Sequence, residues 1–152
     1  VGSEMCIRDS SHIIDYNNVS FYDDYAHHPT EISSVLSGVK SVYRNKEIIC
    51  VFQPHRISRV KNLKNEFSRC FKMANTVLLC PIYKANEKLK LNFTYNSFAK
   101  SIIKNSKVRL IQIEDQFQLI RFIKQNSFGN KIYIGMGAGS ISNWMRNLKN
   151  IF

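Results

Sequence analysis

The amino-acid sequence predicts one α/β domain with a doubly wound, mostly parallel sheet flanked by helices on both faces. Short apolar runs alternate along the chain with segments whose apolar residues recur at helical spacing. The runs are apolar at consecutive positions, as expected for parallel strands that are buried on both faces. The length of 152 residues suits a single globular domain, and no internal repeat or low-complexity linker interrupts the alternation.

The strands are predicted from these apolar runs and from the turn residues that bound them. Asn17 and Asn18 indicate a hairpin turn between the first two strands. Pro81 closes the fourth strand, and a lysine-rich loop follows at residues 82–93. In chain order, the expected strands are 13–16, 19–22, 47–52, 76–80, 108–113 and 131–134.

Each helix is predicted from the spacing of its apolar residues. The first begins at Pro29, with His28 or Thr30 near its N-cap, because proline fits the first helical turn. Its apolar stripe is expected to consist of Ile32, Val35, Leu36, Val39 and Val42. Later helices are expected at about 60–73, 98–103, 115–125 and 140–148. In the helix at 115–125, the inward side chains are expected to be Phe117, Ile120 and Ile123.

The composition favours a cytoplasmic protein that handles an anionic small molecule. Lysine and arginine total 22 against 11 acidic residues, which gives a formal charge of +11. Such a surface attracts polyanions, but the lysines are scattered, so we do not expect nucleic acid as a partner. The four cysteines form no C-x-x-C pair, which favours a reducing compartment. We expect no membrane association, because no apolar stretch approaches the ~18–20 residues of a membrane span.

Residues 1–11 are expected to be a non-native leader, and the domain proper to cover residues 12–152. The stretch from Val1 to Ser10 shows no periodicity and resembles translated adaptor sequence at the end of an assembled read. Sequencing the genomic locus upstream of Ser11 tests this hypothesis. Finding these codons in the native gene would refute it.

Three polar turns follow predicted strands, at residues 23–31, 53–59 and 135–140. In a doubly wound sheet, ligands bind outside the carboxyl ends of the strands. The three turns are therefore expected to share one rim. The glycine turn at 135–140 matches neither the dinucleotide fingerprint nor a P-loop, and we expect a close backbone approach there, capped by Ser140 or Ser142.

The turn at 53–59 predicts an anion site. Arg56 and Arg59 are three residues apart, and a helix that begins near Ser58 places both guanidinium groups around its N-terminus. Planar bidentate donors in that position suit a carboxylate or a phosphate. The alternative is a pair of solvated surface arginines, which the adjacent His55 and the strand end disfavour.

The turn at 23–31 contains two acids and two histidines. Asp23 and Asp24 could accept hydrogen bonds from ribose hydroxyls, bind a metal or lead into a helix cap, and their spacing does not decide between these roles. His27 and His28 are adjacent, so their side chains point apart and no metal site is expected. His27 is instead expected to hydrogen-bond an anionic ligand.

Three stretches of the chain resemble the C-terminal domain of the Mur ligase family of peptidoglycan synthesis. They are Asp-Asp-Tyr-Ala-His-His-Pro-Thr-Glu-Ile at 23–32, Phe-Gln-Pro-His-Arg-Ile-Ser-Arg at 52–59 and Gly-Ala-Gly-Ser-Ile at 137–141, and they occur in the family's order. The first two are long and specific. The resemblance covers roughly residues 12–152.

The resemblance implies the Rossmann-like domain of an ADP-forming ligase that joins L-alanine to UDP-N-acetylmuramate. In the family, a first domain binds the UDP sugar, and a central domain contains the P-loop, the magnesium ligands and most ATP contacts. ATP phosphorylates the muramoyl carboxylate, and the amine of L-alanine attacks the acyl phosphate. ATP and Mg²⁺ are therefore expected cofactors of a full-length enzyme, bound mainly outside this chain.

The resemblance also implies roles for individual residues. Asp24 and Tyr25 are expected on the nucleotide side, with Asp24 at the ribose. The residues expected to bind the amino-acid substrate are His27, His55, Arg56 and Arg59, the last three around its carboxylate. No catalytic residue and no metal ligand are expected in this domain alone.

The chain departs from the family pattern at Ile57, where an aromatic residue is usual, and before the first strand, where an arginine is usual. The two preceding domains do not occur in it, so we expect a fragment without ligase activity of its own.

Two alternatives are a murein tripeptide recycling ligase, which shares the first turn, and a stand-alone module that binds a nucleotide or nucleic acid. Tyr25 and the turn at 53–59 favour the alanine-adding enzyme.

Overall fold

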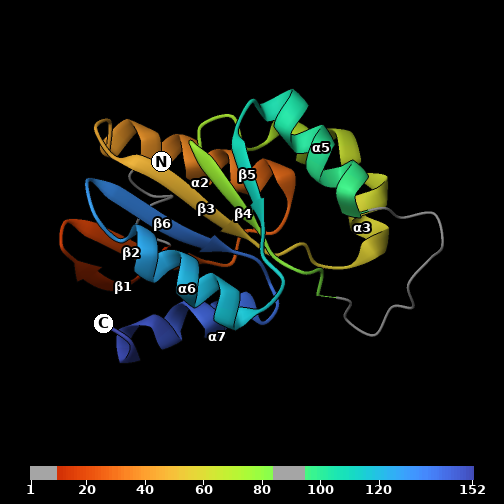
Figure 1. Cartoon of the computed structure of the whole chain (residues 1–152). Helices are drawn as coiled ribbons and strands as arrows, with labels where there is room; N and C mark the ends of the chain where they lie inside the picture. Colours follow the sequence, from red (N-terminus) through yellow and green to blue (C-terminus); the bar gives the residue numbers. More distant parts are fainter. Residues whose placement is uncertain (1–9, 84–94) are drawn as a thin grey trace.

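The computed structural model describes residues 10–83 and 95–152 and contains a six-stranded sheet of order β1-β2-β6-β3-β4-β5 (Figure 1). β1 pairs with β2 in antiparallel fashion, and the other neighbouring strands are parallel. The strands are β1 (Ser11–Tyr16), β2 (Val19–Asp24), β3 (Glu47–Phe52), β4 (Thr76–Leu79), β5 (Arg109–Gln112) and β6 (Lys131–Met136). This arrangement confirms the predicted mostly parallel sheet.

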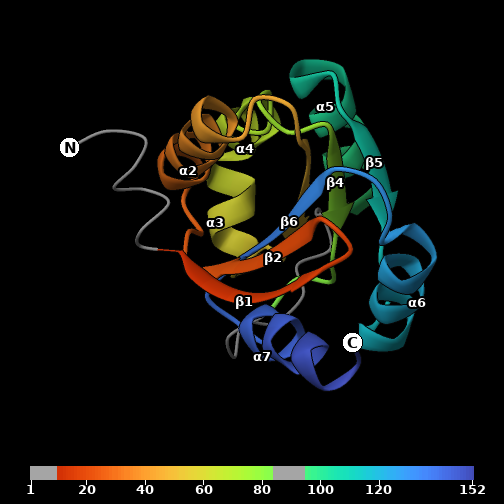
Figure 2. The ribbon, with the colours of Figure 1, turned by 90° about the vertical axis from the view of Figure 1, so that its left-hand side faces the viewer.

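Helices cover both faces of the sheet, as predicted (Figure 2). One face is covered by α2 (Pro29–Val42), α3 (Ile57–Asn62), α4 (Lys64–Arg69) and α5 (Tyr95–Ser106). The other is covered by α6 (Gln116–Asn126), α7 (Ile141–Arg146) and the 3₁₀ turn η1 (Asn147–Asn150). Each face therefore has its own apolar core, with β3, β4 and β6 contributing to both because their side chains alternate.

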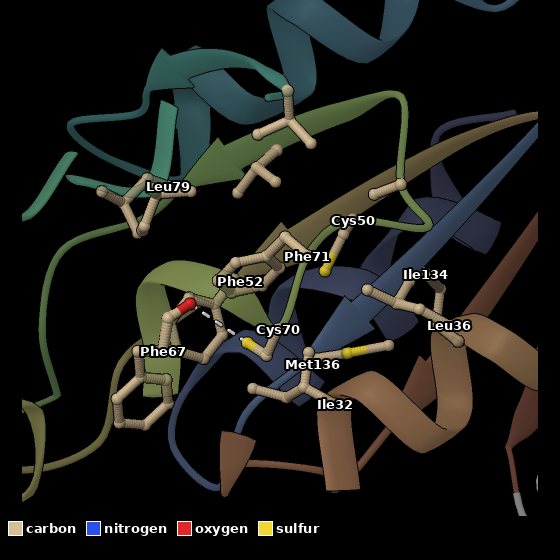
Figure 3. Packing of buried hydrophobic residues seen from close by; sticks show 14 of the residues in the cluster. Ile32, Leu36, Cys50, Phe52, Phe67, Cys70, Phe71, Leu79, Ile134 and Met136 are labelled. Carbon is tan, nitrogen blue, oxygen red and sulfur yellow. Dashed lines mark hydrogen bonds between the residues drawn. The ribbon is translucent and has the colours of Figure 1, made fainter. Parts of the chain in front are cut away.

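Figure 3 shows the core between the sheet and helices α2 and α4. The ring of Phe52 on β3 packs against Phe67 and Phe71, with ring centroids 5.7 Å and 5.1 Å apart. The Cys70 thiol donates to the Phe67 carbonyl oxygen at 3.2 Å, and Cys50 lies buried beside it (Figure 3). Burial raises the pKa of the Cys50 and Cys70 thiols, so both behave as small hydrophobic groups.

The start of α2 follows the prediction from Pro29. His28 is the N-cap, and its Nδ1 accepts the Thr30 backbone N–H at 3.2 Å. The Glu31 carboxylate accepts the His28 backbone N–H at 3.0 Å, which completes a capping box. His28 is therefore occupied in starting the helix. At the other end the prediction for Val42 is wrong, because this side chain is 46% exposed.

Two other helix predictions are wrong in detail. The helix expected at 60–73 is broken at Leu63, which ends α3 and precedes α4. The break lets α4 pack along α5, where Asn105 and Ser106 both hydrogen-bond to Ser68. Phe117 was expected to face inward but is 77% exposed. Ile123 is buried and Ile120 packs against the core, as expected, and Leu119 takes the place that was expected for Phe117.

The β1–β2 hairpin begins slightly earlier than predicted. Asn17 and Asn18 form its turn, with φ values of 50° and 67° that asparagine tolerates well. β1 begins at Ser11, and the Ser10 hydroxyl donates to Asp24 Oδ2 at 2.6 Å. Residues 1–9 and most of the predicted loop at 82–93 lie outside the described residues, so the leader hypothesis stays a prediction.

Candidate functional site

Three turns meet at the carboxyl edge of the sheet, as the sequence predicted. β6 lies between β2 and β3, and Met136 is in register with both Asp24 and Phe52. The chain leaves all three strands at this level. The segments 25–28, 53–56 and 137–140 therefore form one continuous rim at this edge, the rim of the site.

The two aspartates at the end of β2 point to opposite faces and have different partners. Asp23 is 6% exposed, and its Oδ2 accepts the Ser142 hydroxyl at 2.6 Å and lies 3.6 Å from Arg146 Nε. Asp23 therefore anchors α7 to the sheet. Asp24 is 9% exposed and accepts the Ala26 backbone N–H at 2.8 Å, in addition to Ser10. The Asp24 carboxylate thus stabilises the first turn through these two hydrogen bonds and is not exposed to a ligand.

Four rings form a series along the rim. The rings of Tyr25 and His27 have centroids 5.4 Å apart, and those of His27 and His55 are 6.1 Å apart. His55 then stacks on Tyr83 at 5.5 Å with an interplanar angle of 10°. This series joins the first turn to the second. It places the predicted site residues Tyr25, His27 and His55 next to one another.

Arg56 and Arg59 lie at the start of α3, but in different environments. Arg56 is exposed and precedes the first helical residue, Ile57, which is buried. Its backbone has φ 67° and ψ 129°, a region that residues other than glycine rarely adopt, and such strain is concentrated at functional sites. Arg59 is half-buried, and its Nη1 is buried without a hydrogen-bond acceptor among residues 10–83 and 95–152.

Gln53 connects the second turn to the glycine turn. Its side chain is 3% exposed, donates from Nε2 to the Ser140 hydroxyl at 3.0 Å and accepts the Ile141 backbone N–H at 3.0 Å. Ser140 is the N-cap residue of α7, as expected, but its side chain makes no cap hydrogen bond. Gln53 supplies the acceptor instead, and Ser142 binds Asp23. Gly135 lies within β6 rather than in the turn.

A hollow of about 800 Å³ opens beside the second turn. His55 and Arg56 line it, together with Tyr83, Trp144 and the acidic pair Glu114 and Asp115. Of the other predicted site residues, Asp24, Tyr25, His27 and Arg59 do not line it. The hollow thus brings a guanidinium group and carboxylates to the same space, which suits a small ligand with both charges.

No sequence pattern marked Gln53, Tyr83, Glu114 or Asp115 as an individual candidate for the site. The signal for the acidic pair was available, because these residues follow a predicted strand, as the other rim residues do. No such signal existed for Tyr83. It follows Pro81 in a segment expected to be a surface loop, and only the structure places its ring on His55.

The described residues gather no group of three or more His, Cys, Asp or Glu side chains that could hold a metal ion. Within the same residues, no helix is both long enough and apolar enough to cross a membrane. The groups that do meet at the rim and its hollow are the Arg56 guanidinium, the imidazole rings of His27 and His55, and the carboxylates of Glu114 and Asp115.

Comparisons with known proteins identify relatives of this chain. The model of the family described as "Mur ligase, glutamate ligase domain" matches residues 11–139. UDP-N-acetylmuramate–L-alanine ligase of Pelagibacter ubique is 63% identical over 139 residues, which cover 91% of this chain and 30% of that protein. The chain thus spans about 30% of the length of this curated relative.

Two solved structures are similar in fold. UDP-N-acetylmuramate-alanine ligase of Thermotoga maritima gives a TM-score of 0.69 at 24% identity, over 91% of this chain and 28% of that one. A murein peptide ligase of Psychrobacter arcticus gives 0.73 at 17% identity, over 94% of this chain and 29% of that one. At these identities the likeness concerns the fold alone.

Proposed function

The chain belongs to the Mur ligase family, and from this premise we propose that it is the amino-acid-binding domain of an ATP-dependent UDP-N-acetylmuramate–L-alanine ligase. Such an enzyme acts in the cytoplasm in peptidoglycan synthesis. The observation that carries the proposal is the second turn, which places His55 and Arg56 at the rim beside a hollow, with Arg59 following in the first turn of α3.

The carboxylate of L-alanine is proposed to bind to the cationic groups of this turn. Arg56 lies exposed at the hollow, where a planar guanidinium can pair with both carboxylate oxygens. The buried Nη1 of Arg59 would gain an acceptor from the same anion, and a buried donor without one costs about 1–3 kcal/mol. Binding the carboxylate here orients the amine for attack, which is the main contribution that a positioning domain makes to rate.

The first turn is proposed to face the nucleotide and to separate it from the amino acid. Tyr25 is 69% exposed at the rim, where an aromatic face is available to a ligand or a neighbouring domain. Asp24 can accept a hydrogen bond from a ribose through Oδ2 only if the hydrogen bond from the Ser10 hydroxyl to this oxygen is broken. When bound, ATP supplies the phosphoryl group that activates the sugar carboxylate.

ATP, Mg²⁺ and UDP-N-acetylmuramate are proposed to bind mainly to preceding domains of a longer protein. The described residues contain no P-loop sequence and no group of three or more metal-ligating side chains. The 152-residue chain is expected to release no phosphate from ATP on its own.

The acceptor preference of the full-length ligase tests the proposal. Phosphate release that depends on ATP and UDP-N-acetylmuramate is measured with L-alanine and, separately, with the murein tripeptide. The proposal expects turnover with L-alanine. Turnover with the tripeptide alone would assign the domain to a recycling ligase, and turnover by the isolated 152-residue chain would refute the idea that further domains are needed.

A further inference from the structure

Tyr83 makes three separate contacts, two with the second turn and one with the glycine turn. Its ring stacks on the His55 imidazole at a centroid distance of 5.5 Å and is nearly parallel to it. Stacked rings of this kind attract one another beyond the area that they bury. The imidazole is thus held against a flat neighbour on one face, and it meets the His27 ring at an interplanar angle of 67°.

The backbone of Tyr83 holds the peptide on each side of His55. The Tyr83 N–H donates to the Pro54 carbonyl oxygen at 2.8 Å, and the Arg56 N–H donates to the Tyr83 carbonyl oxygen at 2.9 Å. These two bonds form a short parallel bridge between His55 and Tyr83. They hold Arg56 in its unusual conformation of φ 67°, which a free turn would not keep.

The ring of Tyr83 also contacts the glycine turn. A Cβ atom added at Gly139 would lie 2.5 Å from Tyr83 Cγ and 2.7 Å from Gln53 Oε1. Only glycine therefore allows this approach, and Tyr83 connects the two turns that line the hollow. Tyr83 itself is 41% exposed, so it is not a core residue whose loss opens a buried cavity.

We infer that Tyr83 is a positioning residue for the amino-acid carboxylate, which rests on the function proposed above. Its ring fixes the His55 imidazole, and its backbone fixes the direction in which Arg56 leaves the turn. The stacking face, rather than the hydroxyl group, carries this role, so phenylalanine can replace tyrosine. Leucine keeps some of the bulk but removes the flat face.

The first test is spectroscopic and needs no ligase activity. The imidazole proton shifts of the four histidines are measured by NMR in the 152-residue chain and in Tyr83→Leu and Tyr83→Phe. The His55 protons are expected to lose their ring-current shift in the leucine variant and to keep it in the phenylalanine variant, while His28 stays unchanged. An unaltered His55 spectrum in Tyr83→Leu overturns the stacking contact.

The second test is kinetic and uses the full-length ligase. Tyr83→Leu and Tyr83→Ala are expected to raise the KM for L-alanine about two- to tenfold, the range of an aromatic pair, with little change in the KM for ATP. Tyr83→Phe restores the parent value. Phe128→Ala removes an aromatic side chain that is 63% exposed at the opposite end of β6, and it is expected to leave both constants unchanged.

Arg56→Ala is measured alongside to separate the two proposals. If Arg56→Ala raises the alanine KM and the Tyr83 variants do not, the inference about Tyr83 is wrong and the proposed function stands. If neither change affects the alanine KM, both are wrong. If the alanine KM rises in Tyr83→Leu and is equally high in Tyr83→Phe, the inference is also wrong, because the effect then comes from loss of the hydroxyl group or from a general loss of fold.

Discussion

Gln53→Ala tests how the rim is held together. The substitution removes the bond from Gln53 to Ser140, which costs about 0.5–1.5 kcal/mol. It also leaves the buried Ile141 N–H without its acceptor, which costs about 1–3 kcal/mol. We therefore expect the free energy of unfolding to fall by about 2–4 kcal/mol, and Tm to fall by roughly 2–4 °C for each kcal/mol.

Urea unfolding of the 152-residue chain measures this loss, followed by circular dichroism and by tryptophan fluorescence. Trp144 is the single tryptophan and lies on α7, the helix whose first residue, Ile141, loses its hydrogen-bond acceptor. Its fluorescence therefore reports local loosening of this helix. Gln125→Ala is the matched control, because Gln125 is exposed on α6, and a change within about 0.5 kcal/mol is expected there. A loss equally small in Gln53→Ala would refute the account of the rim.

Two further predictions concern titratable groups. Burial tends to raise the pKa of Glu31, but the backbone N–H groups of His28 and His27 outweigh it and lower the pKa below the ordinary 4.5. The ionised Glu31 carboxylate therefore stabilises the fold above its ordinary pKa, and this stabilisation is lost as the pH falls through the lowered pKa of the folded state. In Glu31→Gln, the free energy of unfolding from urea titrations should vary less between neutral and acid pH. Burial also raises the pKa of the Cys50, Cys70 and Cys80 thiols. In a Cys6→Ser variant, maleimide should therefore label these thiols slowly in the native chain and fast in the urea-unfolded chain. Fast labelling of the native chain would contradict their burial.

The fold was largely predictable because the apolar runs are long enough to distinguish a buried parallel sheet from other arrangements. Runs such as 47–52 have no polar face, and each is followed by a helical pattern. The errors arise where packing between helices decides the outcome. Leu63 fits a continuous helical stripe, yet the chain bends there so that α4 reaches α5. Phe117 fits the spacing of an inward residue, but the core side of α6 centres on Leu119 and Ile123, and Phe117 lies at the exposed start of the helix.

The site was predictable only in part. The rule that ligands bind at carboxyl ends of strands brought three turns together, and the structure confirms that they share an edge. The same rule could not tell Asp23 from Asp24, since their difference depends on which face each side chain meets. The contribution of Tyr83 depends on a contact between residues 28 positions apart in the chain, and no local pattern encodes such a contact.

The central claim is that the second turn binds the carboxylate of L-alanine, and the alanine dependence of Arg56→Ala in the full-length ligase tests it most directly. Loss of one charged hydrogen bond of about 1.5–3 kcal/mol predicts a rise of roughly 10- to 150-fold in the alanine KM, with the ATP KM changed far less. Arg44→Ala removes an exposed arginine near the amino end of β3, and is expected to change neither constant. An alanine KM in Arg56→Ala equal to that of the parent would contradict the claim.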